Sequence, residues 1–112
     1  MRLQVMQKRA DFLLTARARR SAQPGMIVQG RNRLDDSSQV RVGFTCSKKV
    51  GNAVFRNRAK RRLREAARLI LPVHALSGWD YVLIGRFEAT AARPFDALQD
   101  DLRRALDQMH PG

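Results

Sequence analysis

The chain has 112 residues, of which 22 are lysine or arginine and 10 are aspartate or glutamate, so its formal net charge is +12. An apolar content of 44% excludes a wholly disordered basic tail and predicts one domain, residues 1–112, with a single modest core and a polyanionic partner. No apolar run could span a membrane, no secretory signal follows Met1, and one cysteine cannot form an internal disulfide, so we expect a cytoplasmic protein.

The first quarter of the sequence predicts a short helix followed by a turn. The helix is expected over residues 8–17, with Phe12 and Leu13 as its apolar contacts. Residues 21–25 end in Pro-Gly, and the fixed φ of proline beside the conformational freedom of glycine indicates a turn. On pattern alone Phe12 is either a core anchor or a stacking platform for an unpaired base, and the core is favoured.

Two strands are predicted next. The first covers residues 26–29, and a polar loop at residues 35–38 joins it to a second strand that runs antiparallel to it. The second is clearer, because apolar side chains alternate with polar or small ones from Val40 to Ser47. Cys46 lies on the apolar side of this alternation, so we interpret it as a small core residue. A tight basic connection, residues 48–52, follows.

The most informative segment is the arginine-rich helix after this connection. Asn52 is its candidate N-cap, and the helix is expected to end before Pro72. At about 100° per residue, an apolar stripe and a cationic face lie on opposite sides. Like charges four residues apart repel, so this helix is best explained if a polyanion is its usual neighbour. The apolar stripe contains Phe55, Ala59, Leu63, Ala66 and Ile70, and the cationic face contains Asn57, Arg61, Arg64 and Arg68, with Arg58 and Lys60 at its edges.

The last third predicts a buried strand and a second long helix. Successive apolar residues within 79–85 indicate a strand that is covered on both faces. Pro94 suits the first turn of the last helix, and the order of elements predicts an α+β domain with helices against a small sheet. The apolar stripe of this helix contains Phe95, Leu98, Leu102, Ala105, Leu106 and Met109. The acidic residues that suit the positive end of its dipole are Asp96, Asp100 and Asp101.

The sequence contains no recognisable catalytic or metal-binding constellation. His74 and His110 have no carboxylate or second histidine at ligand spacing, and Cys46 alone cannot build a zinc site. The acidic residues are few, and there is neither a phosphate-binding glycine loop nor a nucleophile elbow. The residues therefore indicate binding and not independent catalysis.

The cationic residues are suited to contacts with a nucleic-acid backbone. The arginines of the cationic face can engage successive phosphates, and Asn57 can hydrogen-bond to a base edge or a ribose hydroxyl. Lys48 and Lys49 extend the same surface. Two alternatives stay open at this point: a merely solvated charged face, and a DNA-binding helix, although no helix-turn-helix pair or dimerisation heptad is visible.

The ordered block from Arg41 to Glu65 resembles the signature region of the protein component of bacterial ribonuclease P. The block reads RVGFTCSKKVGNAV and then FRNRAKRRLRE, and its Arg-Asn-Arg run followed by Lys-Arg is that family's named motif. Supporting matches are KRADF at residues 8–12 and WDYVLI at residues 79–84. The resemblance covers nearly the whole chain.

The resemblance implies a fold and an activity. The family folds as a two-layer α/β sandwich, with a small mixed sheet of about four strands, three helices and a left-handed βαβ crossover that the general handedness rule would not predict. Our residue patterns give three strands, and residues 48–51 are a candidate for another. The family protein binds a catalytic RNA, and the holoenzyme is an endoribonuclease that removes the 5′ leader of precursor tRNA. The resemblance also implies Mg²⁺ held mainly by the RNA, no catalytic residue on the protein and no obligate protein partner.

The resemblance further implies roles for individual residues. The 5′ leader is expected in a cleft between the sheet and the first helix, and Ala16 and Gln29 stand where many relatives have aromatic residues, which reduces the stacking surface for the leader. A structured-RNA-binding protein of the ribosomal type, unconnected with catalysis, stays the alternative. Contacts to the catalytic RNA are implied at Lys48, Lys49, Arg56, Asn57, Arg58, Arg61, Arg62, Arg64 and Arg68. Contacts to the leader are implied at Phe12, Gln29, Arg41, Asn57 and Lys60.

Overall fold

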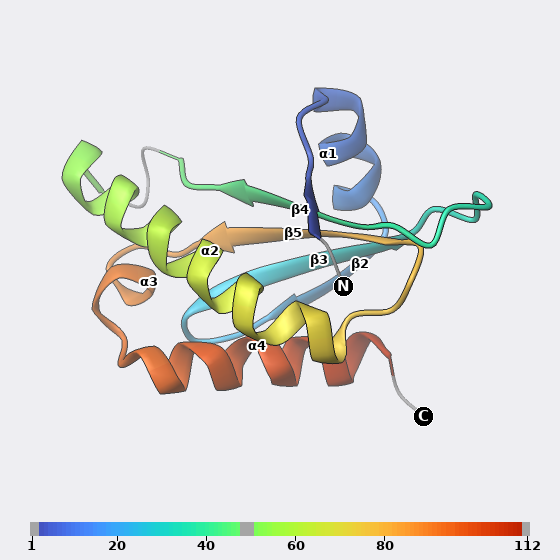
Figure 1. Ribbon diagram of the computed structural model, residues 1–112. Coiled ribbons are helices and arrows are strands. Elements are labelled where there is room, and N and C mark those ends of the chain that lie inside the picture. The colour runs from blue at the N-terminus through green and yellow to red at the C-terminus, as the bar shows by residue number, and fades with distance from the viewer. Residues whose placement is uncertain (1–2, 48–50, 111–112) are drawn as a thin grey trace.

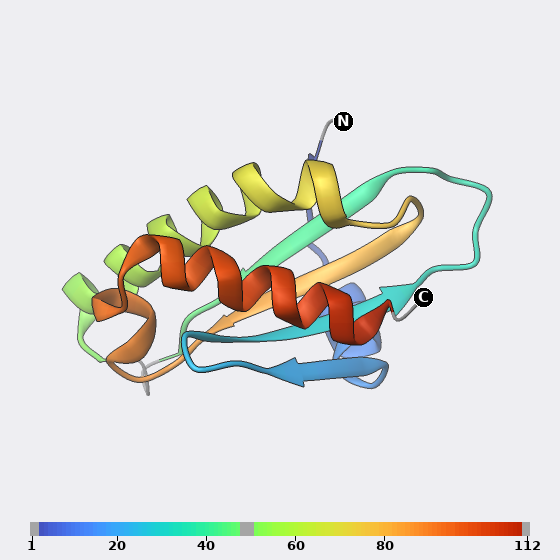
Figure 2. The ribbon, with the colours of Figure 1, turned by 90° about the horizontal axis from the view of Figure 1, so that it is seen from below.

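The computed structural model describes residues 3–47 and 51–110, and this part of the chain forms one mixed sheet with helices on both faces. Helices α2 and α4 cover one face of the sheet, and α1 lies on the other (Figures 1 and 2). No helix of the described part is long and apolar enough to cross a membrane. The elements are β1 (Leu3–Val5), α1 (Arg9–Ala16), β2 (Arg19–Ala22), β3 (Met26–Asn32), β4 (Val40–Thr45), α2 (Ala53–His74), β5 (Trp79–Gly85), α3 (Ala89–Ala92) and α4 (Phe95–Met109).

The sheet has five strands in the order β1-β4-β5-β3-β2. Strands β1 and β5 are both parallel to β4, whereas β3 is antiparallel to both β5 and β2. Strand β5 is therefore central, and residues Trp79 to Leu83 are buried at five successive positions. The prediction of a strand covered on both faces is confirmed.

The unit β4-α2-β5 is a left-handed crossover. The two strands are adjacent and parallel, and α2 connects them along one face of the sheet. Seen from that face with both strands pointing upward, the chain leaves β4 and returns through α2 to a strand on the left of β4 (Figure 2). About 98% of such connections in proteins are right-handed, so the expectation taken from the family resemblance is confirmed against the general rule.

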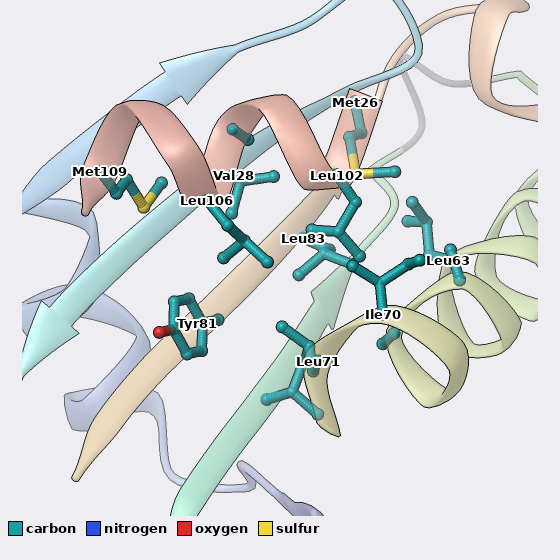
Figure 3. Close-up of a cluster of buried hydrophobic side chains, with 14 of the residues drawn as sticks. Met26, Val28, Leu63, Ile70, Leu71, Tyr81, Leu83, Leu102, Leu106 and Met109 are labelled. Atoms are coloured by element: carbon teal, nitrogen blue, oxygen red, sulfur yellow. The ribbon is translucent and has the colours of Figure 1, made fainter. Parts of the chain in front are cut away.

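The hydrophobic core lies between the sheet and the layer formed by α2 and α4 (Figure 3). The predicted stripe of α4 is buried apart from Phe95, which is partly buried against the core. On α2 the predicted stripe is also buried, except that Phe55 is half exposed at the first turn of the helix. Each fully buried leucine or isoleucine contributes about 1.5–3 kcal/mol relative to an exposed one. The core-facing residues drawn in Figure 3 include Met26, Val28, Leu63, Ile70, Leu71, Tyr81, Leu83, Leu102, Leu106 and Met109.

The start of α2 is set by a local cap, whereas its end is set by tertiary packing. Asn52 is the N-cap, as predicted: its side-chain oxygen accepts a hydrogen bond from the backbone N–H of Phe55 at 3.1 Å. The prediction that the helix ends before Pro72 is wrong, because α2 continues to His74. Proline in the last turn removes one hydrogen bond, but Leu71 beside it is fully buried, so the gain from packing outweighs the local cost.

The sequence patterns did not predict three short elements. Strand β2 exposes Arg19 and Arg20 and has no apolar alternation, because it is an edge strand supported by β3. Strand β1 has three residues, and α3 has four, which is too short for a periodic signal. The structure thus has five strands and four helices in its described part, against about four and three expected. The suggested strand at residues 48–51 falls almost wholly outside the described residues.

Asp101 has a different role from the one that its place in the helix suggests. It does not lie on a solvated face, since its side chain is fully buried. Its carboxylate accepts hydrogen bonds from the backbone N–H of Gly25 at 2.9 Å, from Arg93 Nε at 2.7 Å and from Arg104 Nη2 at 2.6 Å. Asp101 therefore fastens the β2–β3 turn to α4, a contact between residues 76 positions apart that no local pattern reveals.

The end of α4 is fastened by an aromatic cluster. Tyr81 Oη accepts a hydrogen bond from the backbone N–H of Leu76 at 2.9 Å and lies 2.8 Å from His110 Nε2. The His110 ring also packs edge-on against Trp79, with 4.3 Å between ring centroids. Burial, and secondly the charge of Arg19, lower the pKa of His110 from its ordinary value of 6.5, and burial raises the pKa of Tyr81 to about 12.

We predict that acidification weakens the fold through His110. Because the pKa of His110 is lower in the folded chain, the unfolded chain binds the proton more tightly, so this contribution to stability is present above about pH 6.5 and is lost as the pH falls through the folded pKa. The melting temperature of His110→Gln should therefore fall less between about pH 8 and about pH 5 than that of the wild type. His74→Gln, at an exposed position, is the control and should melt with the wild-type pH dependence.

Candidate nucleic-acid interface

Helix α2 exposes the cationic face that the sequence predicts. Asn57, Arg61, Arg64 and Arg68 are all exposed, opposite the buried side of the helix. Arg68 is paired with Glu65, whose two carboxylate oxygens accept hydrogen bonds from its guanidinium, and this contact lowers the pKa of the Glu65 carboxyl. Arg61 and Arg64, on the same side of the helix, form no ion pair among the described residues.

The flanks of α2 face different neighbours. On the flank towards β4, Lys60 lines a hollow, and the Arg64 guanidinium extends from the exposed face to within 5.9 Å of the centroid of the Phe44 ring. On the flank towards α4, the Arg62 guanidinium lies 5.8 Å from the centroid of the Phe95 ring. The predicted RNA-contacting residues are thus distributed over two flanks and the exposed face between them, which we call the crest of α2 and which contains Asn57, Arg61, Arg64 and Arg68.

The hollow on the β4 flank has a volume of about 490 Å³ and is bordered by α1, the end of β4 and α2. It brings together two of the predicted leader contacts, Phe12 and Lys60, although they are 48 positions apart in the sequence. We call it the α1–α2 hollow. Its other lining residues include Gln7, Phe44, Thr45 and Cys46.

Phe12 packs directly on the sheet. A Cβ atom added to Gly43 would lie 2.5 Å from Cε1 of the Phe12 ring, so only glycine at this position of β4 allows the ring to approach. Phe12 is partly buried, and its remaining surface lines the α1–α2 hollow. The sequence left a core role and a stacking role open, and the structure places Phe12 where one part of the ring packs and the other faces the hollow.

Gln29 lies on the same face of the sheet but does not line the hollow. The register aligns Gly43 of β4 with Val82 of β5, and Val82 with Gln29 of β3. Since neighbouring strands are about 4.8 Å apart, Gln29 lies about 10 Å across the sheet from Gly43. It is partly exposed, and an elongated ligand on this face of the sheet could reach both positions.

Arg41 is held by two carboxylates. Its Nε and Nη2 donate hydrogen bonds to the two oxygens of Asp80, at 2.7 and 2.6 Å, and its Nη1 donates to Asp11 Oδ2 at 3.3 Å. These contacts, that with Asp80 above all, raise the pKa of Arg41 further. All three guanidinium nitrogens therefore have a protein partner, and Arg41 connects the sheet to α1.

Asp80 is the centre of this ion cluster, and residue patterns did not single it out. Its side chain is fully buried, and it also accepts a hydrogen bond from Arg33 Nη1 at 2.8 Å, while Arg31 Nη1 lies 3.9 Å away. The signal that was available is an aspartate inside an otherwise apolar strand, since a buried carboxylate requires cationic partners. The partners themselves are distant in sequence and could not be identified.

Several predicted residues lie elsewhere or outside the described chain. Lys48 and Lys49 fall outside the described residues. Asn57 is exposed near the start of α2 but does not line the α1–α2 hollow. Cys46 is partly buried against the core, as expected, and burial raises the pKa of its thiol. In residues 3–47 and 51–110, no group of three or more His, Cys, Asp or Glu side chains could hold a metal ion.

Comparisons with known proteins identify one family. A family model described as Ribonuclease P matches residues 1–110. The ribonuclease P protein component of Ruegeria pomeroyi is 64% identical over 109 residues, which cover 96% of this chain and 87% of the relative. That of Caulobacter vibrioides is 54% identical over 101 residues, covering 90% and 67%.

Solved structures show the same fold. The RNase P protein of Staphylococcus aureus superposes with a TM-score of 0.75 at 29% identity and covers 94% of each chain. The RNase P protein of Thermotoga maritima gives a TM-score of 0.77 at 26% identity, covering 96% of this chain and 98% of the other.

We predict that the Asp80 cluster fixes α1 on the sheet. Replacing Asp80 by Asn removes the buried counter-charge of Arg33 and Arg41, whose remaining carboxylate partners are the more exposed Asp35 and Asp11, and should lower the free energy of unfolding by about 3–5 kcal/mol. Asp11→Asn, which removes only the outer contact, should cost about 1 kcal/mol and increase hydrogen exchange chiefly in α1. Asp100→Asn, in the exposed pair with Arg103, is the control for both. Equal urea midpoints for the Asp80 and Asp100 variants would contradict this role.

Proposed function

The chain belongs to the ribonuclease P protein family, and on that premise we propose that it binds the catalytic RNA of ribonuclease P and the 5′ leader of precursor tRNA. In this role it assists the endonucleolytic removal of the leader that produces the mature tRNA 5′ end. The RNA subunit carries the chemistry, and the protein is not catalytic alone. The observation that carries the proposal is the juxtaposition of an exposed cationic helix with the α1–α2 hollow.

The crest of α2 is the proposed contact with the catalytic RNA. Arg61 and Arg64 are exposed, and neither has a carboxylate partner among the described residues. Phosphates of a folded RNA would relieve the repulsion between these like charges, and neutralised phosphates allow the RNA to fold with less free Mg²⁺. The helix does not have to form on binding, because its opposite side is already buried in the core.

The face of the sheet beside α1 is the proposed leader site. Phe12 offers the exposed part of its ring to an unpaired base, and Lys60 supplies a cation at the opposite wall of the hollow. Gln29 lies farther along the same face and replaces a family aromatic, so the stacking surface is smaller in this chain. Arg41 has its own donors engaged by Asp80 and Asp11, so its proposed part is to hold α1 beside the leader.

We assign Mg²⁺ mainly to the RNA subunit. The buried carboxylates of this chain do not suit a resident magnesium ion, since Asp80 and Asp101 are each surrounded by arginine guanidiniums. At a scissile phosphate, Mg²⁺ bound to the RNA would supply activation of the attacking water and stabilisation of the leaving oxygen. The protein's own contribution is to bind and orient the two RNAs. We place this assembly in the cytoplasm, without an obligate protein partner.

The test of the proposed function is cleavage of a 5′-labelled precursor tRNA at low Mg²⁺. The reaction is run with a bacterial ribonuclease P RNA alone, with this chain alone, and with both. Cleavage at the mature 5′ end only in the combined reaction is the expected result. Cleavage by the chain alone would show an active site on the protein. Absence of stimulation by a folded, RNA-binding chain would favour the general structured-RNA binder instead.

We predict that Phe12 distinguishes precursor from product. In the holoenzyme, Phe12→Ala should weaken the binding of precursor tRNA by about 1–3 kcal/mol and leave the affinity for mature tRNA unchanged, because only the precursor carries the leader. Phe12→Leu keeps the apolar contact with Gly43 while removing the aromatic ring, so it separates stacking from packing. Phe87→Leu, at an aromatic that is 64% exposed elsewhere, is the control. An equal loss of affinity for precursor and mature tRNA would show that Phe12 has a purely structural role.

A further inference from the structure

A second hollow lies on the other flank of α2, where this helix meets the start of α4. Its volume is about 470 Å³, within the range of roughly 300–1,000 Å³ that is usual for small-ligand pockets. We call it the α2–α4 hollow. It shares no lining residue with the α1–α2 hollow, and neither Phe12 nor Lys60 borders it. Its lining residues are Arg58, Arg61, Arg62, Glu65 and Phe95.

The α2–α4 hollow has an uncompensated positive charge. Within the part of the chain that the structure describes, Arg58, Arg61 and Arg62 form no ion pair. Glu65 also lines the hollow, but both of its oxygens already accept hydrogen bonds from Arg68. Three guanidiniums therefore surround a space in which an anion would be stabilised.

The guanidinium of Arg62 is only partly hydrogen-bonded within the protein. Its Nη2 donates a hydrogen bond to the Arg93 carbonyl, and its guanidinium lies over the Phe95 ring at 5.8 Å from the centroid. Its Nε is buried and has no hydrogen-bond partner in the described structure. Burial, and secondly the charge of Arg58, lower the pKa of Arg62, so the site disfavours this cation until an anion joins it.

We propose that the α2–α4 hollow binds one unpaired nucleotide of the catalytic RNA, with its base against Phe95 and its phosphate on Arg58, Arg61 and Arg62. A nucleotide satisfies both properties of the hollow, because its base is planar and apolar on its faces and its phosphate is an anion. Acidic side chains of a protein would match the arginines but would offer no flat apolar face to the part of the Phe95 ring that lines the hollow beside Arg62. This subsite rests on the proposed function and adds Phe95 of α4 to the RNA interface.

Continuity with the rest of the interface favours the catalytic RNA as the source of the nucleotide. Arg61 belongs both to the exposed crest of α2 and to this hollow, so an RNA that binds along the crest also lies next to the hollow. The leader is expected on the opposite flank, across the helix. The RNA would therefore contact α2 from the crest and from the α4 side, and the leader from the β4 side.

The test uses the reconstituted holoenzyme. Ultraviolet crosslinking followed by mass spectrometry should attach a single nucleotide of the catalytic RNA at or beside Phe95. Phe95→Leu, which retains an apolar side chain at the core edge, should weaken the affinity for the catalytic RNA by about 5-fold to 100-fold and should remove the crosslink. Arg58→Ala, at an exposed position where folding is not at risk, should weaken binding and reduce the slope of log affinity against log salt by about 0.7–0.9.

Matched controls separate this subsite from the overall function. Phe87→Leu and Arg103→Ala remove an exposed aromatic and one positive charge outside the hollow, and both should bind the catalytic RNA within about 2-fold of the wild type. The ratio of precursor to mature tRNA affinity should be unchanged in Phe95→Leu, unlike in Phe12→Leu.

Two results would overturn the subsite. In the first, Phe95→Leu and Arg58→Ala each bind the catalytic RNA with wild-type affinity, and no crosslink forms near residue 95, although the wild-type holoenzyme still cleaves the precursor. The other is a crosslink at Phe95 to precursor tRNA instead of the catalytic RNA. Failure of the wild-type chain to bind or stimulate the catalytic RNA would overturn the proposed function itself, which is a separate result.

Discussion

A single buried carboxylate determines where the parts of the candidate leader site lie. Asp80 is fully buried in the central strand, and its oxygens accept hydrogen bonds from Arg33 and Arg41. Because a buried charge is costly unless it is paired, the arginines cannot leave it without a large loss of stability. Arg41 in turn reaches Asp11 on α1, which places Phe12, the next residue, over Gly43. The position of the aromatic ring therefore depends on a chain of ion pairs that begins in the middle of the sheet.

Helix α2 combines a buried apolar side with an exposed side of like charges, although the repulsion between those charges disfavours a helix on its own. Its buried side contains three alanines, Ala59, Ala66 and Ala67, between larger apolar residues, and small side chains let a helix lie close to the sheet and to α4. Its exposed side carries like charges that repel one another. The free energy gained by burying the apolar side offsets the repulsion on the cationic side, so a helix with this sequence is stable as part of the domain. Its flanks then face two different hollows, because sheet and α4 contact it from different directions.

Some charged residues stabilise the fold, and others remain exposed and available to a ligand. The amino-acid composition alone does not distinguish the two groups. Arg33, Arg41 and Arg93 bind buried carboxylates, whereas Arg61 and Arg64 remain exposed on the crest of α2. The net charge of +12 indicates a polyanionic ligand. Only those cationic side chains that are not already paired with a carboxylate of this chain are available to bind it. The same distinction explains why the few carboxylates of the chain do not form a metal site: the two most buried ones are saturated by arginine.

The sequence by itself determined the elements with a strong period and the chemistry of the surface. Alternation in β4, the apolar run of β5, the Asn52 cap and the stripe of α4 are local properties, and the motif around Asn57 identified the family. Tertiary structure alone decided the edge strands β1 and β2, the continuation of α2 through Pro72, and the left-handed return from β4 to β5. It also decided the partners of Asp80 and Asp101 and the meeting of Phe12 with Lys60. These features depend on groups many residues apart that become neighbours only when the sheet and helices pack, whereas periodicity and capping are set within a few residues of chain.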